Sequence, residues 1–80
     1  MDWRKHIHQD PKICGGVPVI RGTRVMIDAV LADLANGRDA AGVRKSYPAL
    51  SDEDVRAVIA YAAESVLRVA PKSRRAKKVA

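Results

Sequence analysis

Apolar residues at helical spacing in the last third of the chain constrain the fold more than any other feature. Between positions 52 and 69 they are Val55, Val58, Ile59, Ala62, Ala63, Val66 and Leu67. Because residues three and four apart lie on one side of a helix, this stripe predicts an amphipathic helix that ends near Val69. The stripe is wide enough to face both the chain's own helices and a second subunit.

The start of this helix carries its own signals. Ser51 followed by Asp54 is a loose match to the capping box, with Asp in place of the usual Glu. Together with Asp52 and Glu53, Asp54 places three carboxylates in the first turn, where they complement the positive end of the helix dipole. The sequence therefore predicts a helix that begins directly after Ser51.

Two shorter helices are expected before it. The first begins near Met26 and ends at Asn36-Gly37, because Asn or Gly readily adopts the left-handed conformation that closes a helix. Its apolar stripe consists of Ile27, Val30, Leu31, Leu34 and Ala35. The second covers residues 40–46, between the N-cap candidate Asp39 and Pro48. A short helix, a tight turn and a longer helix form the outline of a helix-turn-helix.

The first 25 residues predict a lead-in of short extended pieces and turns. Residues 3–8 predict a strand that ends at Asp10-Pro11, and residues 17–20 predict a second extended piece because β-branched side chains favour strands. Turns are expected at Gly15-Gly16 and at residues 21–23. The expected fold is therefore mainly α: a three-helix bundle with a short N-terminal extended or β lead-in.

Positive charge is concentrated at the end of the chain. The net charge is +6, and five of the 15 Lys and Arg residues follow Pro71. These five are Lys72, Arg74, Arg75, Lys77 and Lys78. The other cations nearly balance the nine Asp and Glu residues. We therefore expect one domain over residues 1–70 and a basic flexible tail over residues 71–80 that binds an anionic partner. A solvating chain end without a specific partner is the alternative.

Length and composition limit the class of protein. A chain of 80 residues fits one small domain and excludes an enzyme with a deep cleft between two lobes. Because its core is small, we expect a homodimer, with the 55–67 stripe or the N-terminal strand in the interface. The single cysteine, Cys14, favours a reducing cytoplasmic setting. No membrane span and no secretory signal are expected.

The amino-acid sequence of two segments resembles that of a bacterial and archaeal family known as domain of unknown function 433. Residues 10–24 read DPKICGGVPVIRGTR, and residues 47–55 read YPALSDEDV, followed by Ala60-Tyr61-Ala62. The resemblance covers roughly residues 5–68. It implies a homeodomain-like three-helix fold and a role as an antitoxin similar to the VapB-type antitoxins, with a PIN-like ribonuclease as the partner. The family often has Pro where this chain has Met26, so we expect the first helix to begin less sharply.

A catalytic or metal site has little support in the sequence. His6 and His8 would share a face of the expected strand, and Cys14 would complete only a partial metal set. A structural zinc site needs four ligands at recognisable spacings. We therefore expect no enzyme activity, no cofactor and no metal, with surface histidines and Cys14 as a small hydrophobe. A small metal-dependent or thiol enzyme would require these three side chains to converge.

The candidate DNA contacts lie outside the helix that would normally read bases. A helix-turn-helix places the first residues of its second helix in the major groove, and here these residues are acidic and would repel phosphates. The candidates are instead Arg21, Arg24, Arg44 and Lys45. For Arg21 and Arg24, salt bridges to helix-start acids such as Asp28 or Asp52 are an equally weighted interpretation.

Together with the charge distribution, the resemblance implies an antitoxin-type binding protein that neutralises a PIN-like ribonuclease and binds operator DNA to regulate its own operon. The five cations after Pro71 are the expected toxin contacts, with Arg74 and Arg75 first among them, because guanidinium groups pair bidentately with carboxylates. A stand-alone helix-turn-helix transcriptional regulator is the alternative. The two hypotheses differ in whether an acidic protein or a DNA sequence is the main partner.

Overall fold

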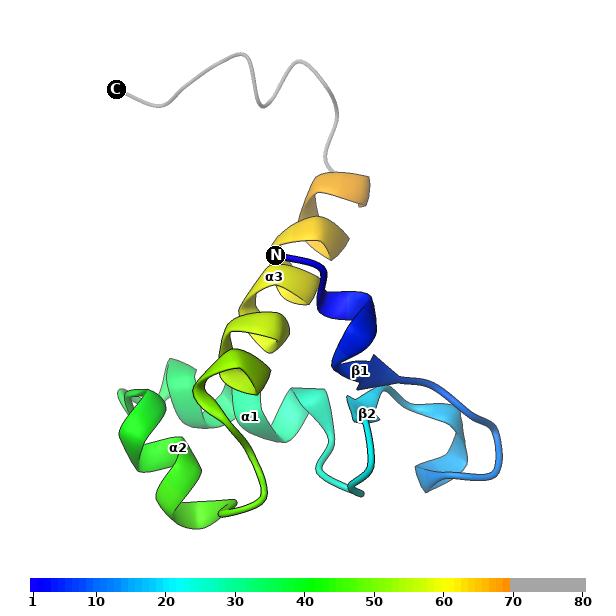
Figure 1. The fold of residues 1–80 in the computed structure, drawn as a ribbon. Coiled ribbons are helices and arrows are strands. Elements are labelled where there is room, and N and C mark those ends of the chain that lie inside the picture. The colour runs from blue at the N-terminus through cyan, green and yellow to red at the C-terminus, as the bar shows by residue number, and fades with distance from the viewer. Residues whose placement is uncertain (70–80) are drawn as a thin grey trace, which may run out of the picture.

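The computed structural model describes residues 1–69 and contains three α-helices preceded by a small lead-in (Figure 1). The lead-in consists of the 3-10 helix η1 (Trp3–Lys5), strand β1 (Ile7–His8), the 3-10 turn η2 (Cys14–Gly16) and strand β2 (Val19–Ile20). The helices are α1 (Ile27–Ala35), α2 (Ala40–Ser46) and α3 (Asp52–Val69). The fold is therefore mainly α with a short β lead-in, as the sequence predicts.

Helices α1 and α2 begin and end where the local signals predict, and α3 begins directly after Ser51 as predicted. The Asp39 side chain accepts a hydrogen bond from the Gly42 backbone N–H at 2.8 Å, which caps α2. Gly37 has a φ of 96°, so it ends α1 in the left-handed conformation that glycine adopts without strain. Met26 is the N-cap of α1 and makes no side-chain capping bond. The expectation of a less sharp start than Pro would give stays a prediction, because Pro would make no side-chain capping bond either.

The lead-in differs from the expectation at both of its strands. Residues 3–8 do not form one strand, because Trp3–Lys5 are a 3-10 turn capped by Asp2 and only Ile7–His8 are extended. The second strand is likewise limited to Val19–Ile20. The two strands pair antiparallel, with Ile7 opposite Ile20 and His8 opposite Val19. Short strands suffice here because the helices, not the sheet, bury most of the apolar surface.

The core forms where the lead-in and the three helices meet. The buried cluster takes Ile7 and Ile20 from the strands, and its helical members are Ile27, Val30, Val43, Val55, Ala57 and Val58. Leu50, in the turn before α3, completes it. Burying a valine or isoleucine side chain fully stabilises the fold by roughly 1.5–3 kcal/mol. Ile7 and Ile20 therefore each contribute about as much stability as a buried residue of the helices. The lead-in is thus an integral part of the domain.

The segment before β1 packs along α3. The Trp3 and Tyr61 rings meet edge to face with centroids 4.8 Å apart, a favoured aromatic geometry. Beside them, Arg4 Nη2 lies 3.1 Å from Glu64 Oε2, and Arg68 reaches the same oxygen at 2.8 Å. All three charged side chains are substantially exposed, so these ion pairs contribute little stability. The aromatic contact is the main attachment of η1 to the helix.

A second attachment joins His6 to the first turn of α3. His6 Nδ1 lies 2.9 Å from Asp54 Oδ1, and Asp54 Oδ2 accepts from the Ser51 backbone N–H at 2.9 Å. The Asp54 N–H in turn donates to Ser51 Oγ at 3.1 Å, which completes the capping box. Partial burial raises the pKa of Asp54, but the hydrogen bonds from Ser51 and His6 outweigh it and hold the pKa below its ordinary value of 3.8.

The apolar stripe of α3 divides into an inner and an outer part. Val55 and Val58 are almost completely buried against the other helices. Ile59, Val66 and Leu67 remain 50%, 58% and 47% exposed. In Figure 1 the carboxyl-terminal half of α3 extends beyond α1 and α2, with η1 along one side of it. The stripe is therefore wider than the chain's own core requires.

Removal of the Ser51 hydroxyl tests the capping box. We expect Ser51→Ala to lower the free energy of unfolding by about 1 kcal/mol, because the Asp54 N–H loses its acceptor at the helix start. Ser65→Ala is the control, since its hydroxyl donates to the Tyr61 carbonyl within the helix and closes no end. Urea unfolding followed by circular dichroism measures both. An unchanged midpoint for Ser51→Ala would show that the cap is dispensable.

Acid titration tests the linkage through Asp54. A pKa that is lowered by folding stabilises the folded state above the unfolded-state value, and this stability is lost as the pH falls through the folded-state pKa. We therefore expect the unfolding free energy of the wild type to fall more steeply below pH 3.8 than that of Asp54→Asn. Asp28→Asn, on the exposed side of α1, is the matched control. Parallel acid limbs for the wild type and Asp54→Asn would contradict the linkage.

Candidate functional site

The four candidate DNA contacts lie on two separate parts of the surface. Arg24 lines an open depression of the lead-in together with His8 and Thr23. Arg44 and Lys45 line a different depression, along α2. All four cations, including Arg21, are exposed. The structure therefore presents two small basic positions and does not gather the four side chains into one patch.

Arg21 has a structural contact that the sequence did not suggest. Its Nη2 donates to the backbone carbonyls of Arg4 at 3.1 Å and Ile7 at 3.4 Å. The Arg21 backbone N–H also donates to the His6 carbonyl at 2.8 Å. The expected salt bridge from Arg21 to Asp28 or Asp52 is therefore wrong. The guanidinium instead satisfies carbonyl groups where η1 passes into β1 and so joins the two strands of the lead-in.

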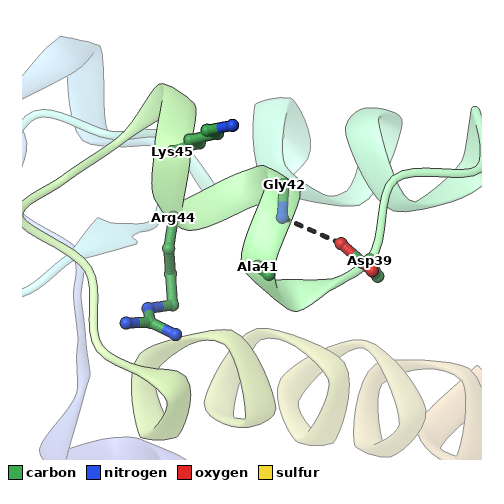
Figure 2. Close-up of a pocket in the computed structure, with 5 residues that line it drawn as sticks. All are labelled: Asp39, Ala41, Gly42, Arg44 and Lys45. Carbon is green, nitrogen blue, oxygen red and sulfur yellow. Dashed lines mark hydrogen bonds between the residues drawn. The ribbon is translucent and has the colours of Figure 1, made fainter.

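Arg44 and Lys45 point in different directions from the last turn of α2 (Figure 2). Arg44 Nη1 lies 2.8 Å from Asp52 Oδ1 and so connects α2 to the start of α3. Both side chains are largely exposed, at 44% and 60%, so this bond adds little stability. It does compensate the charge of Arg44. Within the described residues, Lys45 is the α2 cation that this arrangement leaves facing solvent.

The first turn of α3 occupies the place of a base-reading helix start and is acidic. Asp52 is paired with Arg44, and Asp54 accepts bonds from Ser51 and His6. Glu53 is exposed beside them. Each of the two bonded carboxylates has a role within the fold, as a cap or as an ion-pair partner. The turn is therefore built for helix capping, and its charge opposes an approaching phosphate backbone.

The histidines and the cysteine do not converge. His6 faces Asp54, whereas His8 Nε2 lies 3.8 Å from Asp10 Oδ2. Cys14 is half-buried with its sulfur 3.8 Å from the Arg24 carbonyl oxygen, and it has an unusual positive φ of 50°. Over residues 1–69, no group of three or more His, Cys, Asp or Glu side chains is arranged to hold a metal ion.

The expected toxin contacts lie outside the part of the chain that the structure describes. These are Lys72, Arg74, Arg75, Lys77 and Lys78. The described chain ends with α3 at Val69, three positions before the first of them. In the sequence, the five cations follow the last described residue of the longest helix.

Two contacts between distant segments are not predicted by any pattern in the sequence. His6 meets Asp54 across 48 positions and Arg4 meets Glu64 across 60. No local pattern marks either pair, because both depend on how η1 lies against α3. The capping signal at Ser51 and Asp54 did identify the helix start, but it contained no information about a third partner.

Comparison with known proteins adds one relative and one family. The chain is 37% identical over 65 residues to an uncharacterized protein, y4eO, of Sinorhizobium fredii (strain NBRC 101917 / NGR234). The match covers 81% of this chain but only 29% of that relative's length. No solved structure matches, and no helix within residues 1–69 has both the length and the hydropathy to cross a bilayer.

The match to a family model covers most of the described domain. It spans residues 7–62, from β1 through the greater part of α3, and its description reads "Protein of unknown function (DUF433)". The matched region includes both segments that carry the resemblance, residues 10–24 and 47–55. The chain therefore belongs to the DUF433 family.

Proposed function

We propose that this protein is an antitoxin-type binding protein that neutralises a PIN-like ribonuclease. The observation that carries the proposal is the separation of charge between the domain and the chain end. Five Lys and Arg residues follow Pro71 without an acidic residue among them, whereas the rest of the chain is almost balanced. A segment of this composition binds anionic surfaces.

The contacts within the domain strengthen this separation. Arg44 and Arg68 each lie 2.8 Å from a carboxylate oxygen. Arg21 and Arg38 donate to backbone carbonyl oxygens of neighbouring segments. Many of the domain's guanidinium groups therefore have partners within their own chain. The densest concentration of positive charge along the sequence therefore lies after Pro71, and in this proposal it binds the other molecule.

The chemistry of the proposed partner supplies the anionic surface. A nuclease whose active site gathers carboxylates around a metal ion is strongly negative when the metal is absent. Arg74 and Arg75 would each pair with a carboxylate through two parallel hydrogen bonds and so compete with the metal for its ligands. In this proposal the domain presents the basic segment, acts in the cytoplasm and contacts operator DNA when it regulates its operon.

Deletion of residues 71–80 tests the proposal. The probe is a PIN-like ribonuclease, chosen from the genes beside this chain's gene if one is encoded there, and assayed for magnesium-dependent RNA cleavage with increasing amounts of full-length chain. We expect the full chain to suppress cleavage and the deletion to weaken inhibition by at least about tenfold, equal to about 1.4 kcal/mol of binding free energy. Equal inhibition by the deleted chain would overturn the role of the segment.

Two matched variants separate charge from chain length. Replacing all five Lys and Arg residues after Pro71 with Gln keeps the length and should weaken inhibition as the deletion does. Replacing Lys12 and Lys45 with Gln removes positive charge from the domain alone and should leave inhibition intact. If a nuclease is inhibited equally well by every variant, the domain itself is the inhibitor.

A stand-alone DNA-binding regulator is the second candidate. The observation in its favour is the α2–turn–α3 arrangement, with Lys45 exposed on α2 and Arg24 exposed on the lead-in. The acidic first turn of α3 opposes it, because phosphate contacts supply much of the affinity for DNA. If DNA is bound, the contacts therefore come from the flanking cations and not from Asp52 and Glu53.

The salt dependence of DNA binding discriminates between the two candidates. The DNA probe is a duplex from the region upstream of the gene. If Lys45 contacts a phosphate, Lys45→Ala makes the negative slope of log K against log salt shallower by about 0.9. Lys12 is exposed and is not a candidate DNA contact, so Lys12→Ala should leave the slope unchanged. Identical slopes for Lys45→Ala and the wild type would remove Lys45 from the interface.

A further inference from the structure

A small cavity opens where the lead-in meets α1 and α3. Its volume is about 200 Å³, and it is lined by Val17, Pro18, Ile27, Asp28, Leu31 and Tyr61. The Ile27 N–H donates to the Pro18 carbonyl at 3.0 Å, which holds the segment before β2 against the start of α1. The lining is therefore fixed by the fold, and it is apolar except at Asp28 and the Tyr61 hydroxyl.

The Asp28 carboxylate has no ion-pair or hydrogen-bond partner within residues 1–69. Six of the nine carboxylate side chains do have one, namely Asp2, Asp10, Asp39, Asp52, Asp54 and Glu64. Of the other three, Asp28 lines the cavity, whereas Asp33 and Glu53 do not. The dipole of α1 favours a carboxylate in its first turn, but the Asp28 oxygens stay available to a donor from another molecule.

This combination of apolar walls and one carboxylate selects a cation on an apolar stem. An aliphatic side chain in the cavity would cover Val17 and Leu31, but it would also remove water from the Asp28 carboxylate without replacing it, which costs free energy. A small inorganic cation would leave the walls in water. The methylene groups of an arginine or lysine side chain cover the walls while the charged end reaches the carboxylate.

The aromatic ring of Tyr61 favours arginine over lysine. A guanidinium group stacks on aromatic rings and is more weakly hydrated than an ammonium group. The chain contains this contact next to Tyr61, because the Arg4 guanidinium carbon lies 4.5 Å from the centroid of the Trp3 ring, and Trp3 packs on Tyr61. A guanidinium also donates two parallel hydrogen bonds to one carboxylate, which a single ammonium group does not match.

The size and the surroundings of the cavity indicate an arginine that belongs to a polypeptide. Pockets for small-molecule ligands have volumes of about 300–1,000 Å³, and this cavity is smaller. Val17, which lines it, and Met26, which precedes Ile27 in the chain, are 38% and 39% exposed. One side chain fills the cavity, and apolar residues next to it in a partner peptide cover these exposed side chains.

We propose that this cavity is a docking site for an arginine side chain of a partner protein. The stem of the arginine packs on Val17 and Leu31, and its guanidinium group pairs with Asp28. The proposed antitoxin function is independent of this site, because that function rests on the cations after Pro71, whereas all lining residues belong to the described domain.

Magnetic resonance titration of the isotope-labelled full chain tests the chemistry of the occupant. The probes are the acetylated amides of arginine, of its uncharged near-isostere citrulline, of lysine and of leucine. We expect arginine amide to shift the resonances of the lining residues and to bind about fivefold more tightly than citrulline amide. The factor is modest because Asp28 is exposed. Equal or tighter binding of any other probe, or shifts confined to other parts of the chain, would overturn the proposal.

Matched variants test whether Asp28 is the acceptor. Asp28→Asn should remove the preference for arginine amide over citrulline amide, and Asp33→Asn in the same helix should keep it. Val17→Lys supplies a cation at the cavity itself and should abolish arginine binding, whereas Ala41→Lys adds the same charge on α2 and should not. Circular dichroism checks that each variant is folded. A preference for arginine that survives Asp28→Asn contradicts the assignment.

A peptide probe distinguishes a partner protein from free arginine. The probe is a blocked pentapeptide with arginine at its centre, valine on either side and glycine at both ends. We expect it to bind at least about tenfold more tightly than arginine amide, because its valines cover the apolar surface around the cavity. The same peptide with citrulline at its centre is the control and should bind more weakly. Equal affinities of the arginine peptide and arginine amide would rule out a polypeptide as the occupant.

Discussion

Burial of one side of α3 is the interaction on which the rest of the structure depends. Val55, Ala57 and Val58 share one buried core with residues from both strands, from α1 and α2 and from the turn before α3. The strands reach this core through Ile7 and Ile20, although each strand is only two residues long. A sheet of that size is not stable by itself. The lead-in is ordered because it shares the core of the helices.

The polar contacts around α3 fix how the lead-in lies on it. His6 and Ser51 both bond to Asp54, so one carboxylate caps the helix and attaches the N-terminal segment. Arg21 satisfies two carbonyl groups of that segment from the turn after β2. Removing a single partner of such a bond leaves the other polar group to find water or remain unpaired, and this makes the arrangement specific. The same contacts reduce the number of domain cations that are available to a partner.

Two different surfaces follow from the shape of α3. Its inner side closes the domain, and its outer face remains apolar and exposed at Ile59, Val66 and Leu67. Its acidic start is committed to capping, which disfavours the usual helix-turn-helix approach to DNA.

The amino-acid sequence by itself determined the helices, their caps and the division of charge. Asp39, Gly37 and the Ser51–Asp54 box act within one turn of their own position, so local chemistry was enough to place the ends of the helices. The prediction of a strand over residues 3–8 missed the 3-10 turn Trp3–Lys5, which the local cap Asp2 and the distant contact between Trp3 and Tyr61 hold together.

Only the tertiary structure decided which charged side chains were engaged. Arg21 and Arg44 were equivalent candidates in the sequence, yet one bonds to backbone carbonyls and the other to Asp52. The split of the α3 stripe into buried and exposed parts was decided in the same way. Helical spacing shows which residues share a face, but the amount of that face that is covered depends on where distant segments come to lie. The physical reason is that burial and pairing are properties of contacts made across the fold, whereas capping and periodicity are properties of neighbours along the chain.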